Sequence, residues 1–212
     1  LMLRLQPGLT QLVAVTSDRL STYRANEDRL HRALRELGVP LELTVLRNAT
    51  PEQVRQALRL LGPDAAVLRT SALLREDGGE YPFVEGGRLL ASVSPVPMYI
   101  LWDFDLGLGA VGGSIVNGRL QGGAAADLAL RILAGERADD LTVCESPNAA
   151  TVEWPGLMRF GLDPARIPAG AQVLDRPQSD WERYRPWIIG GMVFLVFETA
   201  LVAVLVTTVL RR

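Results

Sequence analysis

Short apolar runs alternate with amphipathic stretches along the first hundred residues of the chain. Such runs are typical of buried parallel strands, and the stretches between them are typical of helices that cross over a sheet. Four of the runs predict strands, at residues 12–16, 41–46, 65–68 and 97–101. This alternation predicts an α/β fold built on an open parallel sheet.

Boundary signals define two of the predicted helices. The first is expected to begin at Ser17-Asp18, since either side chain can cap a helix, and to end near Gly38. The second is expected to begin at Thr50. Threonine can cap, the next residue is a proline, which is favoured at the first helical position, and Gln53 completes a capping box. A third helix is predicted around residues 85–93.

The pattern is less regular in the second half of the chain. Residues 109–116 predict another strand, residues 122–133 a helix of small side chains suited to close packing on a sheet, and residues 141–144 a short strand. Residues 145–180 are rich in proline and glycine and have weak periodicity. They indicate a connector packed on the domain, followed by a stalk next to a membrane.

Residues 187–210 form the longest apolar stretch, and Glu198 is the one ionisable residue in it. As a helix they extend about 36 Å, against about 30 Å for the hydrocarbon core of a bilayer. The stretch is apolar on nearly every face, whereas a soluble core helix is usually amphipathic. Aromatic residues precede it and Arg211-Arg212 follow it. We therefore predict a single transmembrane helix with the globular part before it.

Glu198 would lie near the centre of the membrane, where a charge is costly and ionisable residues are functional candidates. We interpret it as a protonated side chain that hydrogen-bonds across a helix pair, which makes a homodimer through this helix the expected assembly. The alternative is a tolerated residue that faces lipid or extends toward the interface.

Composition narrows the classes of function. The formal net charge is −2, which gives no indication of a nucleic-acid partner. Cys144 and His31 are the only cysteine and histidine in the sequence. An intrachain disulfide is therefore impossible and a structural metal site is not expected. No cofactor is expected either, and His31 fits a surface position in a charged helix.

Polar residues follow three of the predicted strands. In open parallel sheets, ligands bind at this carboxyl edge. We therefore expect a small-molecule ligand there, held by residues from the set Ser17, Asp18, Ser21, Thr22, Arg69, Thr70, Ser71, Trp102, Asp103 and Asp105.

Alternatives remain for several of these residues. Arg69 could clamp a carboxylate or phosphate, or lie on the surface. Asp103 and Asp105 could form an acid/base pair, but no nucleophile or histidine accompanies them, which favours ligand hydrogen bonding or a role in loop structure. Ser17 lacks the context of a nucleophile and fits a cap or a ligand contact better. The chain is therefore not expected to be an enzyme.

Residues 107–112 (GLGAVG) match the dinucleotide pattern G-x-G-x-x-G literally. That site needs a strand directly before the glycines and a helix directly after them. Here WDFDL precedes and a strand-like SIV follows, so a flexible crossing between two lobes explains the glycines better.

Two long stretches resemble the extracytoplasmic sensor region of bacterial membrane signalling proteins built on a module like the substrate-binding proteins of ABC transporters. One is LGLGAVGG followed by GGAAADLALRILAGE, within residues 95–143. The other is WPGLMRFGLDPARIPAGAQVLDRPQSDWERYR, at residues 154–185. One departure is Ala149, where the family usually has an arginine.

The resemblance implies a type I periplasmic binding fold, with two α/β lobes and a small ligand between them. It implies that residues 1–145 belong to this domain, with 11–105 as the second lobe and 109–145 as a return segment to a first lobe. Most of that first lobe would precede Leu1. Residues 146–186 would be the connector and stalk. The family positions at the strand ends correspond chiefly to Ser17, Asp18, Arg69, Thr70 and Asp103.

The resulting hypothesis is the ligand-sensing and membrane-anchoring part of a bacterial receptor. It would lie in the cytoplasmic membrane with its large domain outside, and its output would commonly be a histidine kinase and sometimes a diguanylate cyclase. The alternative is a membrane-tethered binding component of an ABC transporter. An α/β hydrolase is a third class, which the lack of a Ser/His/acid constellation disfavours.

Overall fold

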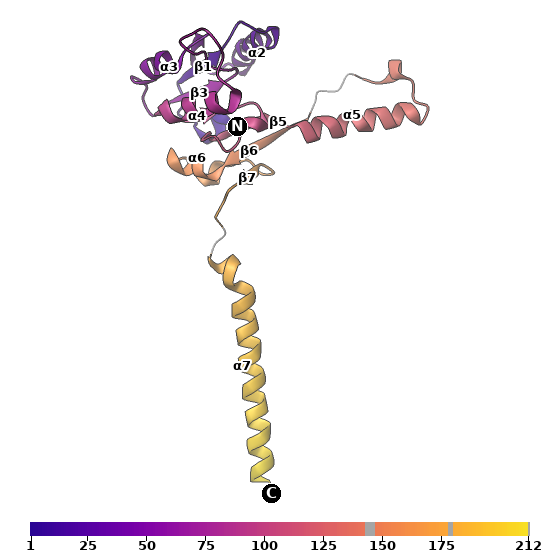
Figure 1. Ribbon diagram of the computed structural model, residues 1–212. Helices are drawn as coiled ribbons and strands as arrows, with labels where there is room; N and C mark the ends of the chain where they lie inside the picture. Colours follow the sequence, from indigo (N-terminus) through magenta and orange to yellow (C-terminus); the bar gives the residue numbers. More distant parts are fainter. Residues whose placement is uncertain (143–146, 178–179, 212) are drawn as a thin grey trace. The chain divides into compact units, whose positions relative to one another are not determined.

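The computed structural model describes residues 1–142, 147–177 and 180–211. The chain divides into two compact units, Leu1–Asp175 and Arg176–Arg212. The first unit contains the sheet and the second contains one long helix (Figure 1).

The first unit is built on a seven-stranded sheet with strand order β2-β1-β3-β4-β5-β6-β7. Neighbouring strands are parallel except for β5 and β6, which run antiparallel. The predicted open α/β sheet is therefore confirmed. The strands are β1 (Gln11–Thr16), β2 (Glu42–Arg47), β3 (Ala65–Arg69), β4 (Met98–Tyr99), β5 (Gly112–Val116), β6 (Asn148–Glu153) and β7 (Gln172–Leu174).

Helices connect the strands, and several of them pack on the sheet. Helices α3 and α4 bury Val54, Leu58 and Leu90 in one apolar cluster. The N-terminal segment and α6 bury Leu5 and Leu157 in a second cluster, against which part of α2 packs. The helices of this unit are α1 (Met2–Leu5), α2 (Ser21–Leu37), α3 (Pro51–Leu58), α4 (Phe83–Val93), α5 (Gly118–Leu133) and α6 (Trp154–Arg159), with short 3₁₀ turns η1 (Asp103–Asp105), η2 (Ala138–Asp140) and η3 (Pro164–Arg166).

The two predicted helix starts have different outcomes. Thr50 and Gln53 form the expected capping box: the Gln53 N–H donates to the Thr50 hydroxyl at 3.4 Å, and the Thr50 N–H donates to Gln53 Oε1 at 2.9 Å. Helix α2, however, begins at Ser21 with Leu20 at its N-cap and no side-chain cap. The prediction that Ser17 or Asp18 caps this helix is wrong, because both contact a residue beyond β2 instead.

The region after β4 also differs from the sequence-based expectation. Strand β5 lies in the same sheet as β4, so residues 112–116 are not part of a separate sheet. Residues 148–174 supply β6 and β7 to that sheet rather than only a connector packed on it. Of the strand predicted at residues 141–144, residues 141 and 142 are described and are not in a strand, and residues 143 and 144 lie outside the described residues.

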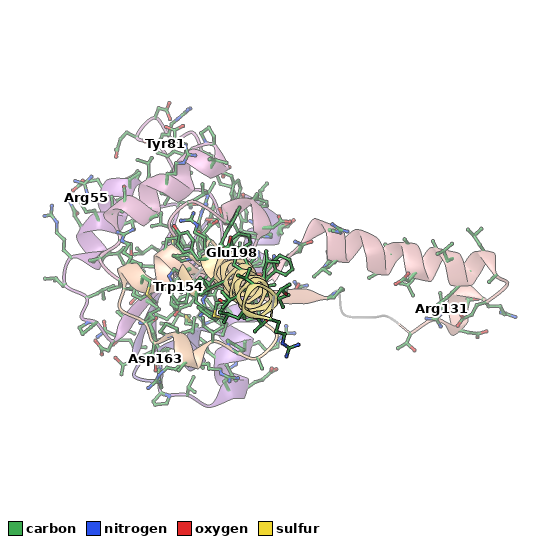
Figure 2. All side chains as sticks on the ribbon, turned by 90° about the horizontal axis from the view of Figure 1, so that it is seen from below. Arg55, Tyr81, Arg131, Trp154, Asp163 and Glu198 are labelled. Carbon is green, nitrogen blue, oxygen red and sulfur yellow. The ribbon has the colours of Figure 1, made fainter. Side chains whose placement is uncertain are left out.

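Helix α5 lies between β5 and β6 in sequence, and none of its residues is buried. Its N-cap is Asn117, whose side-chain oxygen accepts from the backbone N–H groups of Arg119 and Leu120. Near its other end, the Arg131 side chain, labelled in Figure 2, donates to Glu136 at 2.7 Å. Several apolar side chains on this helix are exposed to solvent, and Leu133 is 83% exposed.

The second unit consists of helix α7 (Asp180–Leu210), which contains Pro186 near its start. Its segment Arg183–Leu210 is long and apolar enough to cross a membrane, with a mean hydropathy of 2.4 over an 18-residue window. The predicted span at residues 187–210 lies inside this segment. Glu198 lies within α7 (Figure 2).

Candidate functional site

A buried ion pair lies at the carboxyl edge of the sheet. Arg69 ends β3 and is 0% exposed, and Asp105 in η1 is 1% exposed. The Arg69 Nη1 donates to Asp105 Oδ1, its Nε donates to the Ser71 carbonyl at 3.1 Å, and its Nη2 donates to the Phe83 carbonyl at 2.8 Å. The surface alternative for Arg69 is therefore wrong. All three guanidinium nitrogens bind groups of the protein, so Arg69 holds the loops of this edge in place.

Two buried carboxylates fix the loop that follows β4. Burial raises the pKa of Asp105 to about 6, although the neighbouring Arg69 opposes this change. Burial also raises the pKa of Glu153, which ends β6 and accepts from the Gly107 N–H at 3.0 Å. Asp105 Oδ2 and Glu153 Oε1 are buried without a hydrogen-bond partner in the described part of the chain. The loop that follows β4 is thus held by Arg69 at the end of β3 and by Glu153 at the end of β6.

Three aromatic rings pack together beside the ion pair. The rings of Trp102 and Phe104 stack with centroids 5.6 Å apart and planes 9° apart. Phe83 meets both edge-on, at 6.1 Å from Trp102 and 5.0 Å from Phe104. The Arg69 guanidinium carbon lies 4.8 Å from the centroid of the Phe83 ring. Because Phe104 is 48% exposed, the group presents an apolar surface at this edge.

The first two predicted residues form a separate group with Asn48, which follows β2. The Ser17 hydroxyl donates to Asn48 Oδ1 at 2.9 Å, and Asn48 Nδ2 donates to Asp18 Oδ1 at 2.8 Å. Asn48 has a φ of 53°, a left-handed conformation that asparagine tolerates better than most residues. Ser21 and Thr22 are exposed in the first turn of α2.

The remaining predicted residues have distinct environments. Asp103 Oδ2 accepts from the Gly118 N–H at 3.2 Å, which ties η1 to the start of α5. The Thr70 hydroxyl donates to the Val15 carbonyl at 3.1 Å, and the Ser71 hydroxyl donates to the Ala72 carbonyl at 3.0 Å. Thr70 and Trp102 also line a hollow of about 280 Å³ beside α2.

The structure therefore brings the predicted residues together in three places rather than one. Arg69, Ser71 and Asp105 share the buried ion-pair network, Ser17 and Asp18 share Asn48, and Thr70 and Trp102 share the hollow. Sequence reasoning missed Asn48, Phe83 and Phe104. No sequence signal distinguishes Phe83, but Phe104 lies directly between the predicted residues Asp103 and Asp105, and its position could have identified it.

The glycines of residues 107–112 allow backbone conformations that other residues rarely adopt. Gly107, Gly109 and Gly112 have φ values of 77°, 102° and 127°, which side chains rarely adopt. A strand, β5, begins at the last of them, where a dinucleotide site would have the start of a helix. The structure thus agrees with the interpretation that this run is not a nucleotide-binding loop.

No protein-family model matches the sequence, and no curated protein matches it. Solved structures share its fold. A ligand-free, open substrate-binding protein with adhesive properties from Clostridium difficile has a TM-score of 0.61 at 14% identity, over 83% of this chain and 58% of that one. An ABC domain in complex with L-Trp from Streptococcus pneumonia has a TM-score of 0.59 at 14% identity, over 82% and 58%.

A third similar structure is a conserved domain protein from Vibrio cholerae, with a TM-score of 0.55 at 13% identity, over 81% of this chain and 57% of that one. At these identities the likeness shows the fold alone. The chain spans less than three fifths of the length of each of these proteins.

Proposed function

We propose that this chain is the extracytoplasmic ligand-sensing and membrane-anchoring part of a bacterial signal receptor, most simply a sensor histidine kinase. One observation carries the proposal: a fold shared with substrate-binding proteins is followed, in the same chain, by an apolar helix long enough to cross a membrane. In this arrangement the sheet unit binds a small molecule outside, and α7 transmits the change of state.

The proposal places the sheet unit as the second lobe of a two-lobe receptor. Substrate-binding neighbours extend well beyond the part that this chain matches. Leu130 and Leu133 of α5 are exposed, as expected for a helix that packs on a partner lobe. We propose that residues 118–142 contact that first lobe and that the carboxyl edge of the sheet forms one wall of the ligand site.

Helix α7 has features suited to the interior of a membrane. The hydroxyls of Thr199 and Thr207 donate to the carbonyls of Leu195 and Ala203, at 2.6 and 2.9 Å, one turn earlier in the helix. Such bonds satisfy hydroxyl groups where water is absent. Trp187, the first residue of the apolar stretch 187–210, suits the membrane interface.

The second candidate is a membrane-tethered binding component of an ABC transporter, which the substrate-binding neighbours favour equally. The two candidates differ in what accompanies the chain. A receptor requires a kinase or cyclase domain in the same reading frame after α7, whereas a transporter component requires permease and ATPase genes beside it. Sequencing the coding DNA on both sides distinguishes them.

The topology can be tested with protease. The proposal places residues 1–180 outside the cytoplasmic membrane and Arg211 inside. Protease added to intact spheroplasts should therefore digest the sheet unit, and an epitope placed after Arg211 should survive until the membrane is permeabilised. Full protection of the sheet unit in intact spheroplasts would contradict this topology.

Glu198 provides a test of the proposed homodimer. If a protonated Glu198 hydrogen-bonds across a helix pair, Glu198→Gln should preserve association of the helix and Glu198→Leu should weaken it. The expected loss is about 1 kcal/mol, because such bonds are modest in lipid. A bacterial two-hybrid assay of the span measures it, and equal association of the leucine and glutamate forms would contradict a role for Glu198.

A further inference from the structure

The hollow beside α2 has an apolar floor on the face of the sheet. Leu68 of β3, Leu101 and Trp102 after β4, and Val116 of β5 contribute to its lining. Strand β5 buries Ile115 on one face and leaves Ser114 and Val116 exposed on the other. The central strands of a parallel sheet are normally covered on both faces, so this open patch at the sheet's centre is unusual.

Polar side chains surround this apolar floor. Asn26 and Arg29 come from one face of α2, since they are three residues apart, and Asn148 comes from the start of β6. Across the described residues, the side chains of these three have no hydrogen-bond or ion-pair partner, and neither does the hydroxyl of Ser114. Four polar groups from three elements thus line one hollow, and three of them, on Arg29, Ser114 and Asn148, are exposed and accessible to a ligand.

The charge in the hollow has one sign. Arg29 is the only ionisable residue among the described residues that line it, although the chain as a whole has a formal net charge of −2. A guanidinium without a carboxylate partner favours an anion and disfavours a cation. The hollow measures about 280 Å³, close to the lower end of sites for small molecules.

From this arrangement we infer that the hollow binds a small organic anion with a flat apolar body, whose carboxylate pairs with Arg29 and whose body lies against Trp102. The inference rests on the proposed sensing function and specifies its ligand class. Trp102 is suited to this contact because Phe104 and Phe83 pack on its ring and fix it before the ligand arrives. The amides of Asn26 and Asn148 supply additional donors for the carboxylate.

The test uses the full chain in lipid nanodiscs and two matched probes, 3-phenylpropionate and its neutral amide. The indole N–H resonance of Trp102, assigned with a Trp102→Phe variant, reports occupancy. The anion should shift this resonance in a saturable manner and bind about tenfold more tightly than the amide, as expected for one charge-assisted hydrogen bond. Equal affinity for the two probes, or no shift by either probe, would overturn the inference that the hollow binds a small organic anion.

Variants on α2 distinguish a specific contact of Arg29 with the ligand from a general effect of the positive charge on this helix. Arg29→Gln should weaken the anion about tenfold and leave the amide unchanged, and Arg29→Lys should retain most of the affinity. Arg35→Gln removes the same charge from the same helix, six residues from Arg29 and outside the hollow, and should change nothing. A loss of affinity in Arg35→Gln equal to that in Arg29→Gln would show only a long-range charge effect and would overturn the inference.

The outcomes also separate this inference from the proposed function. Saturable binding of a neutral ligand that is insensitive to Arg29→Gln would leave the sensing role intact and contradict the anionic site. Binding of 3-phenylpropionate through Arg29, in a chain whose sheet unit is protected from protease in spheroplasts, would support the site and contradict the extracytoplasmic receptor.

Discussion

Replacing Asp105 by leucine should destabilise the sheet unit by about 3–5 kcal/mol, because the change leaves the buried guanidinium of Arg69 without its counterion. Arg69 and Asp105 are 0% and 1% exposed, so water cannot replace the lost carboxylate. The two carbonyl acceptors that remain, on Ser71 and Phe83, hold the guanidinium but do not balance its charge. Urea unfolding of the full chain in detergent, followed by near-ultraviolet circular dichroism, measures the change.

A double variant is the control for this prediction. Arg69→Met combined with Asp105→Leu removes both charges and keeps an apolar volume, so it should recover a large part of the stability lost by Asp105→Leu alone. A double variant as unstable as the sum of the two single variants would show that the two side chains contribute independently, and that the ion pair is not what holds these loops.

Replacing Gly113 by alanine should destabilise the sheet unit by about 3 kcal/mol or more, since the new methyl group collides with backbone that cannot move without disrupting the sheet. A Cβ at Gly113 would lie 3.0 Å from the carbonyl carbon of Ile100 and closer still to its oxygen. The neighbouring Gly112 accepts from the Ile100 N–H at 3.0 Å, so β4 and β5 approach closely here. Thermal unfolding of the full chain measures the effect.

Gly122 provides the matched control. It lies in α5, and a Cβ there would meet nothing within 4 Å. Gly122→Ala should therefore leave the sheet unit unchanged and favour α5 by about 1 kcal/mol through helix propensity. If Gly113→Ala were tolerated as well as Gly122→Ala, β5 would not lie against Ile100 as described.

The first four strands and the start of α3 were predictable because each depends on local sequence. Apolar runs fix β1, β3 and β4, which are largely buried, and the alternation of residues 41–46 fixes the edge strand β2. The Thr50 capping box is formed within four residues. Strands β6 and β7 were not predictable in this way. They lie in a segment rich in proline and glycine, and β7 is three residues long, so their pairing rather than their own pattern makes them strands.

The candidate site was predictable in location and only partly in detail. The rule that ligands bind at the carboxyl edge of the sheet identified Arg69 and Asp105, but not that they pair with each other across 36 residues of sequence. Such pairing depends on the loop conformation after β4. Arg29 and Asn26 were not singled out, because the sequence shows the apolar face of α2 but does not distinguish the polar residues that border this face from those that face only solvent.

Strands β5 and β6 pair from Gly112↔Val152 to Val116↔Asn148, so the chain leaves the sheet and returns to it at adjacent positions. Residues 117–147 are, in topological terms, the loop of a β-hairpin. The entropic cost of closing such a loop increases only slowly with its length. The hairpin therefore tolerates a long insertion here with little loss of stability. The excursion that carries α5 is therefore a module that could be shortened to a tight turn, or exchanged for another segment, without changing the register of the sheet.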